Sequence, residues 1–155
     1  MKKNYVKSNV CQIDDLTCFG CCGNNYKTKD EVLIGIKKNT KEFEDWISLE
    51  KPVKDFLRRM RFVRDCGVCF SVIEKDGKVF CPGHPELNNG NDLREGHCDI
   101  HYLCKTAYFY KEWDDKKKEK FIKFIKSKNL EWYEFSIGMD NDSLLKEFED
   151  DKKYF

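Results

Sequence analysis

The sequence predicts a small, mainly helical α+β fold with one β-hairpin and irregular metal-binding loops. Three observations support this: apolar residues repeat at helical spacing, one turn sequence separates short strand-forming runs, and nine cysteines lie almost entirely in tight clusters. The chain has 155 residues, of which 40% are hydrophobic, so it is long enough to bury a core. We expect a single domain across residues 1–155.

The first sixty residues predict a loop followed by three short helices. Residues 1–27 are polar, lack a clear periodicity and hold the first cysteines, so we expect a loop wrapped around a site. The capping-box pattern from Thr28 to Glu31 opens a short helix. A second helix is expected to begin near Thr40. Pro52 suits the first turn of a third helix, in which apolar residues recur at helical spacing.

Strand-forming residues on either side of Asp76 and Gly77 predict a β-hairpin across residues 70–80. With a two-residue turn, Cys69 and Cys81 would face opposite sides of the ribbon. With a three-residue loop and Gly77 in the left-handed bulge position, the two cysteines would share a face. We therefore expect the bulged turn, and a two-residue turn with Cys69 and Cys81 on opposite faces would refute this site.

The last third of the chain is expected to be helical. Residues 98–112 and 115–128 both carry apolar residues on one side, and the second segment is rich in lysine. Residues 130–137 are short and aromatic and fit either a strand or a helix. Gly138 is expected to break that segment, and an acidic helix is expected at about 142–150.

The charge and hydropathy of the chain argue against several partners. Lys and Arg number 29 and Asp and Glu 28, so neither nucleic acid nor an anionic membrane surface is an expected partner. No apolar run reaches the ~18 residues of a membrane span, and the N-terminus does not resemble a secretory signal. We expect a cytoplasmic protein, in which clustered cysteines are more often metal ligands or redox groups than disulfides.

The middle cluster of cysteines has the most specific spacing. Two residues separate Cys66 from Cys69, and the same spacing links Cys81 to His84. Two such knuckles joined by a hairpin are the usual way to place four soft ligands tetrahedrally around zinc. The alternative is that the three cysteines are small buried hydrophobic residues and that His84 is a loop residue.

The first cluster comprises Cys11, Cys18, Cys21 and Cys22. Adjacent side chains diverge, so Cys21 and Cys22 suit a place between two metals, or between a metal and a cluster, better than one mononuclear ion. Glycines on both sides of the pair would permit the tight backbone that such a site requires. The alternative is a reactive or disulfide-forming pair.

The third group comprises His97, Cys98, His101 and Cys104. In a helix, both histidines and Cys104 would share a face, with Cys98 near its edge. The histidines are weak candidates, since surface histidines and satisfied core histidines are common. The cysteines are better candidates, because thiolates are preferred soft ligands.

Nine cysteines with one or two histidines supply about enough ligands for two tetrahedral sites, or for one iron–sulfur cluster beside one zinc. The expected ligands are Cys11, Cys18, Cys21, Cys22, Cys66, Cys69, Cys81, His84, Cys98 and Cys104. Zinc is the favoured metal, with iron or an iron–sulfur cluster as the alternative. No carboxylate pair, phosphate loop or nucleophile motif is visible, so no residue is predicted to be catalytic.

The sequence thus indicates a metal-binding cysteine-cluster protein whose zinc or iron sites have a structural or regulatory role. An alternative is an iron–sulfur protein that acts in electron transfer or in the modification of another protein. Its expected partners are metal ions and, in that alternative, another protein. A zinc-finger-like module for nucleic acid is the weakest interpretation, because the charge is balanced.

The cysteine pattern resembles the YkgJ-like cysteine-cluster family, described as a zinc- or iron-chelating domain with an N-terminal CxxCxxCC motif. The resemblance covers roughly residues 11–104, and residues 105–155 would be a helical extension outside it. It departs from the family pattern in its six-residue first spacing, its longer hairpin and the sequence that follows Cys81. The resemblance implies as ligands Cys18, Cys21, Cys22, Cys69, Cys81, Cys98 and Cys104, whereas Cys11, Cys66 and His84 are supported by spacing alone.

Overall fold

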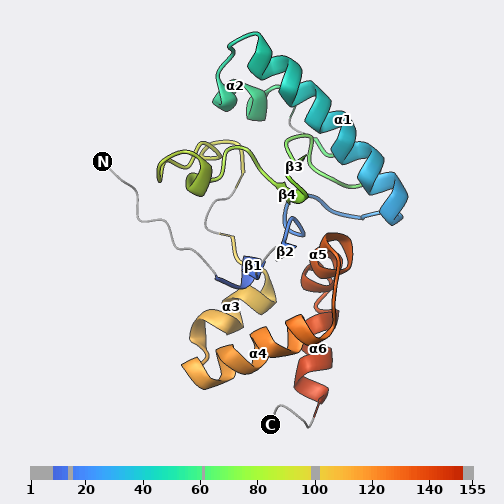
Figure 1. Cartoon of the computed structure of the whole chain (residues 1–155), viewed down its shortest axis with the longest axis vertical. Helices are drawn as coiled ribbons and strands as arrows, with labels where there is room; N and C mark the ends of the chain where they lie inside the picture. The colour runs from blue at the N-terminus through green and yellow to red at the C-terminus, as the bar shows by residue number, and fades with distance from the viewer. Residues whose placement is uncertain (1–8, 14–15, 61, 99–101, 152–155) are drawn as a thin grey trace. The chain divides into compact units, whose positions relative to one another are not determined.

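The computed structural model describes residues 9–13, 16–60, 62–98 and 102–151. Within these residues, six α-helices and two small antiparallel hairpins confirm the expected, mainly helical α+β fold class (Figure 1). The contacts divide the chain into two compact units. Among the described residues, unit 1 runs from Cys22 to Tyr102, and unit 2 combines those up to Cys21 with those from Leu103 onward. The single domain expected from the sequence stays a prediction.

Unit 1 begins with α1 (Lys29–Ser48), the long helix in Figure 1. Thr28 caps it by accepting a hydrogen bond from the Glu31 N–H at 3.3 Å, which confirms the predicted helix start. The prediction of a second helix at Thr40 was wrong, because α1 continues through it. The Thr40 hydroxyl donates to the Ile36 carbonyl one turn back, at 2.8 Å, so it caps no new helix.

Two aromatic residues of α1 pack on α2 (Val53–Arg58), the third helix expected from the sequence. Phe56 of α2 is fully buried, and its ring lies 5.0 Å from that of Phe43 and 6.0 Å from that of Trp46. Both pairs have an edge-to-face geometry, which adds to the free energy gained by burial. This small aromatic core fixes α2 against the end of α1.

The hairpin of unit 1 comprises β3 (Ile73–Lys75) and β4 (Lys78–Phe80). Lys75 pairs with Lys78, so the turn has two residues and the predicted three-residue bulged turn was wrong. The φ angles of Asp76 and Gly77 are 54° and 77°. Asp-Gly readily adopts this turn with two positive φ angles, whose twist matches that of the flanking strands. A short 3₁₀ helix, η2 (Pro85–Leu87), follows the hairpin.

Unit 2 contains a small N-terminal ladder where the sequence predicted only loop. A 3₁₀ turn, η1 (Asn9–Cys11), leads into β1 (Gln12–Ile13), which pairs antiparallel with β2 (Leu16–Thr17). The loop prediction missed this ladder because its strands are only two residues long. Val10 and Ile13 are buried in the same apolar cluster as residues of the C-terminal helices, which explains why this segment belongs to unit 2.

Four helices complete unit 2: α3 (Lys105–Glu112), α4 (Asp115–Ser127), α5 (Trp132–Asp140) and α6 (Ser143–Asp150). The predicted helices at 115–128 and about 142–150 are confirmed. The helix expected at 98–112 begins only at Lys105, and the aromatic segment at 130–137 proves to be helix. Among the described residues, no helix combines the length and the hydropathy that a membrane crossing requires.

Gly138 does not break α5 as predicted, because it is required for close packing inside the helix. A Cβ atom at this position would lie 2.6 Å from Cγ of Leu144 in α6. We expect Gly138→Ala to lower the free energy of unfolding by about 1–3 kcal/mol, the usual cost of overpacking. Urea unfolding measures this cost. Lys123→Ala on the exposed side of α4 is the control and should change stability by less than about 0.5 kcal/mol.

Candidate metal-binding thiol groups

Four cysteines of unit 2 form the first group, here called the unit 2 thiol group: Cys11, Cys18, Cys21 and Cys104. Each of the other three thiols acts electrostatically on Cys18. The Cys18 N–H also donates to the Cys11 carbonyl at 2.9 Å. Cys11 and Cys21 are exposed, whereas Cys18 and Cys104 are partly buried, so the group is open to an ion from solvent.

Neighbouring residues hold the chain around Cys18 in place. Phe19 is buried against Trp132 of α5, with ring centroids 5.7 Å apart, and its N–H donates to Oγ of Ser136 at 3.1 Å. A Cβ at Gly20 would lie 2.6 Å from the Ser136 carbonyl oxygen, so only glycine permits this close approach to α5. These contacts anchor the segment from Cys18 on one helix of unit 2.

Cys104 enters the group from the start of α3. It is the N-cap residue of this helix, and its Sγ accepts a hydrogen bond from the Ala107 N–H at 3.4 Å. A thiolate is favoured at a helix N-terminus by the backbone amides and the helix dipole. The helix expected at 98–112 begins only after Cys104, so His97, Cys98 and Cys104 do not share a helical face. His101 lies outside the described residues.

The environment of the unit 2 thiol group opposes thiolates in the absence of a cation. Burial, followed by the neighbouring Cys11 thiol, raises the pKa of Cys18 well above its ordinary value. Burial also raises the pKa of Cys104, and Cys21 and Asp142 raise it further. A bound metal ion would reverse this balance, because its positive charge stabilises each thiolate that it contacts.

Unit 1 contains a second set, here called the unit 1 thiol group: Cys69, Cys81 and Cys98. Burial raises the pKa of Cys81 to about 12; the Gly83 amide and the Arg94 guanidinium lower it, whereas Cys69 and Cys98 raise it. Two of the three thiols are partly buried, and that of Cys98 is exposed.

His97 adjoins this group. Its Nε2 lies 3.9 Å from Sγ of Cys69. Burial, and then the charges of Arg58 and Arg59, lower the pKa of the His97 ring, which favours the neutral form that binds metal.

Backbone pairing positions Cys69 within unit 1. Its N–H donates to the Cys22 carbonyl at 2.8 Å, and its own carbonyl accepts from the buried side chain of Asn39 in α1 at 2.9 Å. The Val72 N–H donates to the same carbonyl at 3.2 Å, so the chain turns before β3 and Cys69 leaves the hairpin ribbon. Cys69 and Cys81 therefore come together although the predicted turn, and the argument from strand faces, were wrong.

The structure assigns Cys66 and His84 to other surroundings. Cys66 is buried, and a Cβ at Gly35 of α1 would lie 2.7 Å from its Sγ, so this thiol faces the helix. His84 acts on Asp92. Burial alone would raise the pKa of Asp92, but the hydrogen bonds from Arg94 and the nearby charge of His84 lower it. The paired two-residue spacings thus do not bring all four of their residues to one point.

The vicinal cysteines fall on either side of the boundary between the units. Cys21 belongs to unit 2 and Cys22 to unit 1. A Cβ at Gly23, directly after the pair, would lie 2.1 Å from the Gly67 carbonyl oxygen. The tight backbone expected from the flanking glycines is therefore present at Gly23 as well as at Gly20.

The thiols of both groups are the kind of donor that a thiophilic metal prefers. Each group also has a fully buried hydroxyl without a hydrogen-bond partner two residues after a cysteine: Ser71 after Cys69 and Thr106 after Cys104. Hydroxyls so placed are the type of group that supports metal-bound thiolates. As the side chains stand, the described part of the chain contains no set of three or more His, Cys, Asp or Glu residues that could hold a metal ion.

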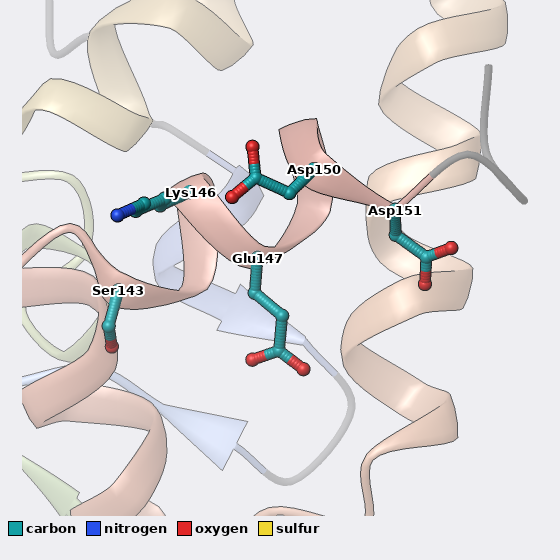
Figure 2. Close-up of a pocket in the computed structure, with 5 residues that line it drawn as sticks. All are labelled: Ser143, Lys146, Glu147, Asp150 and Asp151. Carbon is teal, nitrogen blue, oxygen red and sulfur yellow. The ribbon is translucent and has the colours of Figure 1, made fainter.

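A shallow hollow on α6 is a different kind of surface (Figure 2). Its lining residues are Ser143, Lys146, Glu147, Asp150 and Asp151. Their side chains point in different directions and do not converge on one point. Lys128 forms an ion pair with Glu147 there. This arrangement is typical of a solvated helix face.

Comparison of the chain with protein-family models, with curated proteins and with solved structures finds no match. The resemblance to the YkgJ-like family depends on the cysteine motif and stays a prediction. The chemistry of the two thiol groups is therefore the basis on which a function can be assigned.

Proposed function

We propose that this protein binds zinc through thiolate-rich sites, one in each unit, and that these ions have a structural or regulatory role. The observation that supports this most strongly is the unit 2 thiol group, in which each of the other three thiols acts electrostatically on Cys18. Segments more than eighty residues apart contribute to it, since Cys104 comes from α3. Four thiols brought together from distant parts of a chain are typical of a closed structural zinc site.

A structural role is supported by the small size of the two units. A small domain buries a smaller share of its surface on folding than a large one, and small domains commonly compensate with a bound metal. Binding of zinc to folded thiols adds its free energy directly to folding, because the unfolded chain has no formed site.

An iron–sulfur cluster is the second candidate, and it applies to unit 2. The unit 2 thiol group supplies four cysteines and no histidine, which is the ligand set of the common iron–sulfur clusters. Such a cluster would suit electron transfer or the modification of another protein. Its strong visible absorption distinguishes it from zinc.

Metal analysis of protein purified without air tests the proposal. We expect about two zinc ions per chain and no visible absorption. A strong chelator should then lower the melting temperature and reduce the helical circular dichroism signal, because the metal-free units lose their structural ions. Brown protein with labile sulfide would favour the iron–sulfur candidate. Both the zinc and the iron–sulfur proposals would be contradicted by protein that contains no metal and whose melting temperature does not change with chelator or added zinc.

A further inference from the structure

We infer that His97 is the fourth ligand of the metal in unit 1, together with Cys69, Cys81 and Cys98. This inference rests on the proposed function and goes beyond it, because it assigns a ligand that neither the spacing of the cysteines nor the family resemblance supplies. It replaces His84, the histidine that the spacing favours, with one that the sequence makes a weak candidate.

The distance between His97 and Cys69 is close to that expected of two ligands on one ion. Zinc lies about 2.3 Å from a thiolate sulfur and about 2.0–2.1 Å from an imidazole nitrogen, so at a tetrahedral angle the two donor atoms are roughly 3.6 Å apart. Nε2 of His97 lies 3.9 Å from Sγ of Cys69. The two donors therefore need only a small shift to share an ion.

A single turn positions His97 and Cys98. The N–H groups of both residues donate to the Arg94 carbonyl, at 2.8 Å and 3.1 Å, and Gly96 between them and Arg94 has a φ of 83°. Adjacent side chains diverge from the backbone, but an imidazole Nε2 extends farther from the backbone than a thiol sulfur. His97 can thus turn toward Cys69 while Cys98 approaches from its own side of the backbone.

The Arg94 side chain supplies positive charge beside such a site. Three thiolates and one neutral imidazole around a divalent ion carry a net charge of −1. The Arg94 guanidinium acts on both Cys81 and Cys98, and two hydrogen bonds, of 2.8 Å and 2.7 Å, hold it on Asp92. This pairing orients Arg94 beside the thiols and stabilises them as ligands.

Cys22 is the competitor for the fourth position. Its carbonyl accepts the Cys69 N–H, so its backbone lies next to the unit 1 thiol group. The side chain of His97, by contrast, places its own donor atom Nε2 3.9 Å from Sγ of Cys69. His97 is also held by the turn that carries Cys98.

Cobalt(II) titration of the full chain, with zinc competition, tests the inference. The ligand-field bands of cobalt shift with the number of thiolates around it, so His97→Cys should keep two bound ions and shift the bands of one of them. His97→Ala should weaken the binding of one ion by more than the roughly 10–100-fold loss that outer-shell changes cause. His84→Ala is the matched control and should change neither the bands nor the affinity.

The possible failures are distinguishable. If His97→Cys and His97→Ala leave the cobalt spectrum and the zinc affinity unchanged while Cys22→Ser removes one ion, Cys22 is the fourth ligand. The inference is then overturned, but the proposed function stands. If the unaltered protein binds neither cobalt nor zinc, the proposed function itself fails. Because His97→Cys substitutes one zinc ligand for another, it tests the inference even if His97→Ala does not fold.

Discussion

Cys18→Ser is expected to remove the metal of unit 2 and to leave that of unit 1 in place. The zinc content should fall from about two ions per chain to about one, because a hydroxyl does not replace a thiolate as a soft ligand. The melting temperature of unit 2 should fall as well, because the free energy of zinc binding stabilises the folded state. In small metal-dependent domains this free energy is roughly 10–16 kcal/mol. Elemental analysis and calorimetric melting measure the two effects.

Cys66→Ala is the matched control for this experiment. It also removes a cysteine from a conspicuous spacing, but its thiol faces Gly35 of α1. We expect the variant to retain both ions. Its free energy of unfolding should fall by about 1 kcal/mol, because the lost sulfur leaves a small cavity. If Cys66→Ala lost an ion and Cys18→Ser lost none, the division of thiols between the two groups would be wrong.

Local features of the fold were predictable from the sequence where a short-range signal decided the structure. The hydroxyl of Thr28 accepts the Glu31 N–H as the capping box predicts, and the lysine-rich α4 follows from its apolar spacing. The errors at Thr40 and Gly138 have one cause. Each residue was interpreted by its local preference, whereas packing against a distant element determines its role: the Thr40 hydroxyl accepts from Glu74, and Gly138 admits Leu144.

The candidate cysteines can be named from the sequence, but their division into two groups cannot. Clustered cysteines indicate metal, and eight of the nine lie in or next to the two thiol groups. Their division depends on burial of Val10, Ile13 and Phe19 with the C-terminal helices, which carries the first cysteines into unit 2. No local pattern encodes this pairing of segments more than ninety residues apart.

The surroundings of Cys66 could not be predicted from its spacing, for a related reason. A pair of cysteines two residues apart can turn back on one ion, but this requires both side chains to leave the core. Cys66 instead fills the space that Gly35 leaves in α1. The absence of a side chain at Gly35 was visible in the sequence, yet only the packing of α1 explains its relation to Cys66.

The affinity of the unit 2 thiol group for zinc is expected to rise steeply with pH. Burial raises the pKa of Cys18 and Cys104, so in the metal-free protein these thiols are protonated near neutral pH. Zinc binds thiolates, and each thiol that coordinates must therefore release a proton. Each released proton contributes a tenfold change in affinity per pH unit, so four thiols give roughly a ten-thousandfold change.

The zinc affinity of the unit 1 thiol group should rise less steeply with pH if His97 is a ligand. Burial raises the pKa of Cys81 to about 12, so its thiol also releases a proton, as do those of Cys69 and Cys98. His97 binds as a neutral ring and contributes little above its own pKa, so roughly a thousandfold change per pH unit is expected. Competition with a chelator between about pH 7 and 8, with Cys18→Ser to isolate unit 1, measures both slopes. A pH-independent affinity would mean that the thiols are already ionised and that their burial does not govern metal binding.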